Sequence, residues 1–256
     1  MIKYSEHFKK NRKGTSIFIK RYNDKYSHLI QHEFLKSKML YEISKDSPYF
    51  NFPRPLKCNK EEISFEFIKN NIDFKYFLLK NNNIFFFNKK KVYKIINELG
   101  KALGQIHNKL QIKNKVILED NIKKGKQVFL FGDLGLSNIL INNNKITLID
   151  SSFNHINKKV NIYGSFYYDL AYFFFNLQYL YPLFYRILIN FKKNNKIFTL
   201  FLKSYESETK RKINLEILTE YFFEIKKQYI RNIDTSILTG KIWNYILKND
   251  KNFKKI

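Results

Sequence analysis

The chain has 256 residues, of which 44% are hydrophobic and 18% aromatic, so it can bury the core of one large domain or one two-lobed unit. This composition excludes a disordered chain, and a single cysteine, Cys58, excludes an intrachain disulfide. The formal net charge of +25 favours anionic partners, although scattered lysine clusters are also what a compositional bias towards lysine would produce.

The first part of the chain is predicted to form β structure with one helix. In chain order the predicted elements are a turn at 11–15, a strand at 16–20, a helical stretch at 29–43, and strands at 56–58 and 63–68 around a turn at 59–62. We therefore predict a small, β-rich N-lobe at residues 1–69.

The second part is predicted to be mostly helical. Its predicted elements are an amphipathic helix at 92–106, a buried strand at 128–131, a hairpin of 138–141 and 145–149 around 142–144, and helices after Tyr168. The fold class is therefore α+β, with residues 70–256 as a larger C-lobe. The apolar stretch 167–190 contains too many polar groups to span a bilayer, and 1–20 lacks a signal-peptide core, so we expect a cytoplasmic protein.

Three polar side chains around the predicted hairpin suit phosphoryl transfer. Asp133, on the loop after a buried strand, can accept a hydroxyl proton or orient an attacking oxygen. Asn138 and Asp150 offer hard oxygen ligands that can converge on Mg²⁺. Each residue alone also has a structural interpretation, as a turn cap, a loop residue or a strand end. Their joint pattern predicts a reaction centre.

The segment F-G-D-L-G-L-S-N-I-L-I (131–141), followed by I-T-L-I-D (146–150), resembles the catalytic loop and metal-binding aspartate of protein-kinase-like enzymes. Within that group it is most similar to the aminoglycoside phosphotransferase and choline kinase family, whose signature reads H-G-D-x-x-x-x-N followed by I-D. The resemblance covers residues 15–180. It implies a two-lobed protein-kinase-like fold that uses ATP and Mg²⁺, with Asp133 catalytic and Asn138 and Asp150 as metal ligands.

The same resemblance implies a nucleotide site in the N-lobe. Lys20 matches the strand lysine that holds the α- and β-phosphates, and Glu33 matches the helix glutamate that pairs with it. The backbone of Glu66, Phe67 and Ile68 matches the hinge that hydrogen-bonds adenine.

Two further residues match supporting positions of the family. Asp169, in Y-Y-D-L-A, matches the aspartate that opens a buried helix and accepts N–H bonds from the catalytic loop. It is also a good N-cap residue by its chemistry alone. His107 matches a histidine that ends the helix before the loop, where we expect it to pack rather than to catalyse.

The chain departs from the family pattern at three places. Phe131 replaces the histidine two residues before the catalytic aspartate, and Ser151 replaces the aromatic residue after the second one. No glycine-rich phosphate motif occurs, and Gly14 is the only glycine before Lys20, so the cover for the phosphates must come from a short loop at 11–15 or be poor. These departures leave open a degenerate kinase fold that binds a ligand or acts as a scaffold without catalysis.

The acceptor is predicted to be a hydroxylated small molecule or glycan. Gly135 stands where protein kinases carry a lysine, and only 151–168 lies between the second aspartate and Asp169, which argues against a protein acceptor. Lysines and an arginine beyond Leu180 argue against a polycation and for an anionic or neutral sugar, such as one of a lipopolysaccharide core. These residues are Lys192, Lys193, Lys196, Lys210, Lys212, Lys226, Lys227 and Arg231.

The charge leaves two further partners open. One is peripheral contact with an anionic membrane surface, and the other is nucleic acid, for a compact basic kinase acting near RNA. Only the bulk charge supports nucleic acid, because no recognition motif of interleaved aromatic and basic residues occurs.

Overall fold

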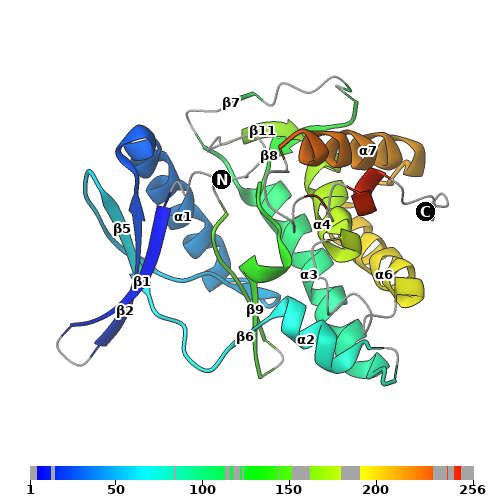
Figure 1. Ribbon diagram of the computed structural model, residues 1–256, viewed down its shortest axis with the longest axis horizontal. Helices are drawn as coiled ribbons and strands as arrows, with labels where there is room; N and C mark the ends of the chain where they lie inside the picture. The colour runs from blue at the N-terminus through cyan, green and yellow to red at the C-terminus, as the bar shows by residue number, and fades with distance from the viewer. Residues whose placement is uncertain are drawn as a thin grey trace.

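The computed structural model describes residues 5–12, 15–83, 85–112, 116–117, 122, 124–143, 145–151, 162–179, 191–232, 241 and 245–248. These residues form two parts, a β-rich one with the first helix and a larger one made mainly of helices (Figure 1). The predicted α+β class is confirmed. No helix in the described ranges is both long and apolar enough to cross a membrane.

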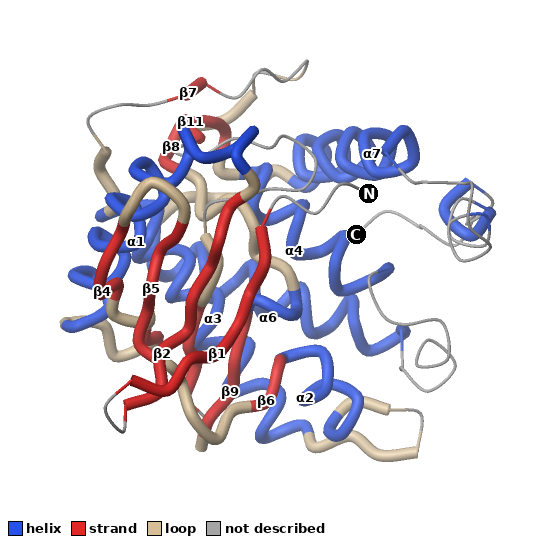
Figure 2. The backbone as a smooth tube through the Cα atoms, turned by 60° about the vertical axis from the view of Figure 1, so that its left-hand side comes forward, coloured by secondary structure: helices blue, strands red, loops and turns tan. Residues whose placement is uncertain are grey.

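The first sheet has four antiparallel strands in the order β1-β2-β5-β4 (Figure 2). Their bounds are β1 (Ser5–Arg12), β2 (Thr15–Tyr22), β4 (Pro55–Cys58) and β5 (Glu62–Glu66). The register pairs Arg12 with Thr15, so cross-strand pairing extends both strands into the turn predicted at 11–15, and that prediction was wrong at its edges. Residues 13–14, between the strands, lie outside the described residues.

The first helix, α1 (Ile30–Lys45), follows a 3-10 turn (Asp24–Leu29) and lies between the first sheet and the helical part (Figure 1). Ile30 packs into a small core that belongs to the N-terminal part alone; its buried members are Tyr22, Tyr26, Ile30, Ile63 and Phe65. α1 also buries two charged side chains, Glu33 and Lys36. Because burying a charge is costly unless it is paired, these residues indicate a polar network on this helix.

The second sheet carries the predicted hairpin. Its order is β3 (Phe50–Asn51), β10 (Lys145–Leu148), β9 (Ile139–Asn142) and β6 (Ile72–Asp73). The hairpin of β9 and β10 is confirmed, but Asn138 lies in the 3-10 turn Leu136–Asn138 before it. β3 pairs in parallel with β10, which ties an early segment of the chain to the hairpin.

A third small sheet consists of β7 (Val116–Ile117), β11 (Ile162–Ser165) and β8 (Gln127–Phe129). The strand predicted at 128–131 therefore ends earlier, at Phe129. The hydrogen bond from Leu130 N to Ile162 O is the last contact of this segment with the sheet, and the chain then turns into the loop that carries Asp133.

The helices of the larger part are α2 (Phe74–Asn81), α3 (Lys89–Lys109), α4 (Tyr167–Tyr179), α6 (Phe191–Thr209) and α7 (Leu215–Asn232). α3 buries the apolar stripe predicted from its spacing. α4 is buried along almost its whole length, and its phenylalanines pack on α6, with ring centroids 4.2 Å apart for Phe174 and Phe198. This aromatic core supports the site that α4 reaches.

Close packing of α3 on α6 makes a specific prediction for Gly100. A Cβ at Gly100 would lie 2.5 Å from the carbonyl oxygen of Phe201 and 2.8 Å from the Cβ of Ser204. We expect Gly100→Ala to lower the free energy of unfolding by about 1–3 kcal/mol, because the clash outweighs the gain in helix propensity. Urea unfolding would measure this. Lys94→Ala, on the exposed face of the same helix, is the control and should stay within about 0.5 kcal/mol; equal effects would contradict the packing argument.

Candidate active site

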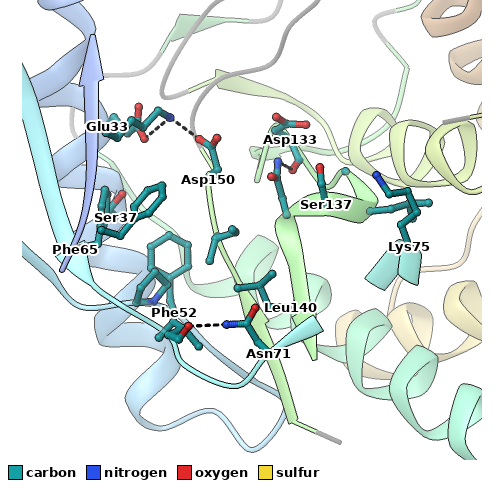
Figure 3. A pocket seen from close by; sticks show the side chains of 18 of the residues that line it. Glu33, Ser37, Phe52, Phe65, Asn71, Lys75, Asp133, Ser137, Leu140 and Asp150 are labelled. Carbon is teal, nitrogen blue, oxygen red and sulfur yellow. Dashed lines mark hydrogen bonds and ion pairs between the residues drawn. The ribbon is translucent and has the colours of Figure 1, made fainter. Parts of the chain in front are cut away.

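A cavity of about 810 Å³ lies between the two parts of the molecule, which is within the usual size of a ligand site (Figure 3). Every residue predicted to be catalytic, nucleotide-binding or metal-binding lines it, namely Lys20, Glu33, Glu66, Phe67, Ile68, Asp133, Asn138 and Asp150. Asp169 does not line the cavity and lies in the core behind it. The fold thus brings together residues that are up to 130 positions apart in the chain.

Lys20 links the two parts across the cavity. Its ammonium group lies 2.9 Å from Glu33 Oε1 on α1 and 2.5 Å from Asp150 Oδ1 beyond β10. Lys20 and Glu33 are both almost fully buried, and burial raises the pKa of the Glu33 carboxyl although Lys20 opposes this. The predicted lysine–glutamate pair is therefore present, with a second carboxylate attached to it.

Asp169 fixes the backbone of the loop that precedes Asp133. Its carboxylate is fully buried and accepts hydrogen bonds from the N–H groups of Phe131 at 2.6 Å and Gly132 at 3.0 Å. Gly132 has φ of 96°, a conformation that favours glycine. α4 begins at Tyr167, so Asp169 lies inside its first turn, and the prediction that it caps this helix was wrong. Its oxygens bind the loop instead.

His107 is a buried member of the same network. Its Nε2 lies 2.9 Å from Asp169 Oδ2 and its Nδ1 2.8 Å from the hydroxyl of Tyr205. Burial lowers the pKa of the imidazole, which favours the neutral ring. Arg211 Nη1 donates to the hydroxyl oxygen of Tyr205 at 3.1 Å, so the Tyr205 O–H is left to donate to Nδ1, and in the neutral ring Nε2 carries the proton. This fits the expectation that His107 packs.

Asp133 occupies a buried position with one open face towards the cavity (Figure 3). Its Oδ1 accepts a hydrogen bond of 2.9 Å from the hydroxyl of Tyr172, on α4. Burial, followed by the nearby charge of Asp150, raises the pKa of Asp133 to about 8. A carboxylate of raised pKa is a better proton acceptor, provided that cations in the site keep it ionised.

Asn138 and Asp150 are held next to each other by the backbone. Asn138 O accepts from Ile149 N at 2.9 Å, one residue before Asp150. The side-chain N–H of Asn138 donates to Asp133 O at 3.1 Å, which leaves its Oδ1 as an acceptor. Asp150 has φ of 52°, an uncommon conformation for a residue other than glycine.

These donors fit Mg²⁺ chemically. Mg²⁺ is usually bound through one or two protein oxygens, while phosphates and water complete its shell. The carboxylate of Asp150 and the amide oxygen of Asn138 would hold the ion.

The predicted hinge follows β5 directly. The N–H of Glu66 donates to Arg54 O at 2.9 Å, so it already has a partner within the protein. Asn71 donates to Ile68 O at 2.6 Å and fixes the next turn (Figure 3). A hinge donor to a purine therefore has to come from Phe67 or Ile68, while Glu66 can offer its carbonyl oxygen.

Lys36 is a site residue that sequence reasoning missed. It lies on α1, is 1% exposed, and donates to Phe131 O at 2.9 Å and to Ser151 O at 2.6 Å. These are the two positions at which the sequence departs from the family pattern. Burial lowers the pKa of the ammonium group to about 8, while surrounding carboxylates oppose this shift. One side chain thus ties α1 to the segments that carry Asp133 and Asp150.

Tyr172 and Lys75 were also missed. Their only signal in the sequence is position: Tyr172 lies one turn after Asp169 in α4, and Lys75 is in the first turn of α2, just after the hinge. Helical spacing alone cannot show which of many tyrosines and lysines reaches the cavity.

No protein-family model matches the sequence, and no curated protein matches it. Several solved structures do match the fold. They include choline kinase LicA from Streptococcus pneumoniae, with a TM-score of 0.55 at 13% identity, covering 94% of this chain and 88% of that one. A streptomycin–ATP–APH(2")-IIa ternary complex matches with a TM-score of 0.52 at 12% identity, covering 91% of this chain and 84% of that one. WaaP in complex with acyl carrier protein matches with a TM-score of 0.51 at 12% identity, covering 90% of this chain and 87% of that one.

At these identities the likeness establishes the fold. The predicted two-lobed, protein-kinase-like fold of the aminoglycoside phosphotransferase and choline kinase type is therefore confirmed.

Lys36 provides a direct test of the loop network. We expect Lys36→Met to lower the free energy of unfolding by about 2 kcal/mol or more, because two buried carbonyl groups lose a charged donor. Urea unfolding would measure this, and hydrogen exchange should show faster exchange in the loop after β8. Lys38→Met, an exposed lysine of the same helix, is the control. Equal stability of the two variants would contradict the structural role of Lys36.

Asp133 makes the stability of the metal-free protein depend on pH. With a pKa raised from 3.8 to about 8, the folded chain holds a proton that the unfolded chain has lost between these values. The contribution of Asp133 is therefore complete at low pH and is lost as the pH rises towards 8. As the pH rises, the free energy of unfolding of Asp133→Asn should increase relative to that of the wild type by up to about 1.4 kcal/mol per pH unit. Urea unfolding in chelator from pH 5 to 8 measures this; parallel curves would refute it.

Proposed function

We propose that this protein is an ATP- and Mg²⁺-dependent phosphotransferase that phosphorylates a hydroxyl group of a small-molecule or glycan acceptor. The observation that carries the proposal is the meeting of Lys20, Asp133, Asn138 and Asp150 around one cavity. A matched structure contains streptomycin and ATP, which supports a nucleotide and a small acceptor as the ligands of such a cavity. A cytoplasmic location remains part of the proposal.

Each side chain has a defined task in this reaction. Lys20 binds the α- and β-phosphate oxygens. Asn138 and Asp150 would hold Mg²⁺, which would supply positive charge to neutralise the phosphates. Asp133 orients the acceptor hydroxyl and takes its proton. The hydroxyl oxygen forms a bond to the γ-phosphorus as the bond to the β,γ-bridging oxygen breaks, so the products are ADP and a phosphomonoester.

The described lining of the cavity supports an acceptor that is not a polycation. Its four acidic residues are Glu33, Glu66, Asp133 and Asp150; the first and last bind Lys20, Glu66 is at the hinge, and Asp133 faces the reacting hydroxyl. The remaining polar groups beside the catalytic loop are uncharged apart from Lys75, which is placed next to Ser137 (Figure 3). We therefore assign Lys75 to an anionic or hydroxyl group of the acceptor.

A degenerate, non-catalytic fold would follow if the changes at Phe131 and Ser151 had disordered the two loops. The contacts of Lys36 and Asp169 argue against this, because both loops keep their backbone partners. The substituted side chains are buried rather than turned into the cavity. This supports a competent site without the usual histidine and aromatic residue.

Nucleotide binding is the first test. Mg²⁺ and ATP together should raise the melting temperature of the wild type, since a ligand of the native state adds to its stability. Lys20→Met and Asp150→Asn should lose most of this shift, whereas Asp133→Asn should keep the shift and lower turnover roughly 10²–10⁴-fold. No shift in the wild type would refute the proposal in favour of a scaffold, and full turnover by Asp133→Asn would refute the role of Asp133.

A panel of acceptors is the second test, with labelled ATP and phosphorylated sugars, neutral sugars and aminoglycosides. We expect transfer to a phosphorylated or neutral sugar. Lys75→Gln should raise the KM for an anionic acceptor about tenfold without changing the KM for ATP. Lys80→Gln, at the other end of α2, is the matched control. A preference for aminoglycosides, or a higher KM for ATP in Lys75→Gln, would overturn the acceptor assignment.

A further inference from the structure

The connection between α2 and α3 lies at the lower right of the molecule in Figure 1. It contains two neighbouring phenylalanines that are exposed to solvent. Phe85 is 85% exposed and Phe86 is 53% exposed, the former being the most exposed large apolar side chain among the described residues. Two adjacent side chains that are this exposed contribute little to the packing of the fold. Such a feature indicates contact with another surface.

The exposed pair is held in place rather than being a slack loop. The side-chain oxygen of Asn83 accepts from Phe85 N at 2.9 Å and from Phe86 N at 2.7 Å. Asn83 N donates to Phe86 O at 3.0 Å, and the next residue, Phe87, packs its ring against Tyr93. The turn therefore anchors one phenylalanine on the core and projects the other two.

Lysines are frequent in the sequence on both sides of the projecting rings. Residues 74–97 contain six lysines and no acidic residue, and Lys80, Lys89, Lys90 and Lys91 are exposed. The last three open α3, where the positive end of the helix dipole disfavours cations. The helix dipole therefore does not account for this cluster, although Lys89 lies 5.5 Å from the ring centroid of Tyr93 and Lys91 5.7 Å from that of Phe77. Its charge is complementary to an anionic surface.

We propose that this tip, defined as Phe85, Phe86 and Lys89–Lys91, docks the protein on the surface of an anionic lipid membrane. The two rings enter the boundary between headgroups and acyl chains while the lysines face the lipid phosphates. A convex tip suits a flat lipid surface better than single-stranded nucleic acid, which is usually held along a groove. The proposal is independent of the phosphotransferase activity.

Vesicle binding tests the proposal with the full-length chain. We expect the wild type to sediment with vesicles of phosphatidylcholine and phosphatidylglycerol, less so at high salt, and not with phosphatidylcholine alone. Binding to the anionic vesicles should be about tenfold or more weaker in each of two variants, the double variant Phe85→Ser/Phe86→Ser and the triple variant Lys89→Gln/Lys90→Gln/Lys91→Gln. Lys57→Gln/Lys60→Gln/Lys69→Gln removes the same charge from exposed positions elsewhere and should bind like the wild type, as should Phe223→Ser.

Insertion can be observed separately. Phe85→Trp should show a blue shift of its fluorescence with anionic vesicles, after subtraction of the wild-type signal. Three outcomes would overturn the proposal. One is equal loss of binding in the control triple variant, which would mean that bulk charge suffices. A second is that the tip binds single-stranded RNA and not vesicles. The third is that the protein self-associates and that Phe85→Ser/Phe86→Ser abolishes this self-association.

Discussion

The ammonium group of Lys20 lies between two carboxylates that come from different parts of the fold. Glu33 belongs to α1, whereas Asp150 follows the β9–β10 hairpin. Because removal of one partner would leave an uncompensated charge in a buried place, typically at a cost of about 3–5 kcal/mol, the three groups constrain one another. The position of the first sheet, the tilt of α1 and the path of the chain after β10 are therefore linked at one point.

A second layer of charged side chains holds the backbone around that point. Asp169 binds two N–H groups of the loop before Asp133, and Lys36 binds one carbonyl on each of the segments that carry Asp133 and Asp150. Both are buried, so their contacts act in a medium of low polarity, where such hydrogen bonds are strong. Within the two loops, these contacts go to backbone atoms. This explains how Phe131 and Ser151 can replace the usual side chains while the backbone keeps its course.

Much of this could be predicted from the sequence because its signals are local. The asparagine turn at 142–144 between two short segments predicted the hairpin, and the apolar stripe predicted α3. The pattern of Asp133, Asn138 and Asp150, with its resemblance to a known family, predicted that these polar groups converge. Lys36 could not be found, since a lysine on a helix is solvated by default and only tertiary packing shows that it is buried. The capping role of Asp169 was wrong because the prediction considered its own helix, whereas the carboxylate binds a loop 37 residues away. The observed strand ends differ from the predicted ones where pairing between strands, and not local sequence, decides where a strand ends.

The contacts of Lys36 also bear on how the proposed enzyme could be regulated. In kinases whose activity is switched, the helix that carries the glutamate paired with the strand lysine moves, and an aromatic ring next to the metal-binding aspartate changes its packing. Here an outward swing of α1 would strip two carbonyls of their donor, and Ser151 has no ring to fill the space left behind. The proposed enzyme would therefore be assembled at all times, with its output set by the supply of its ligands.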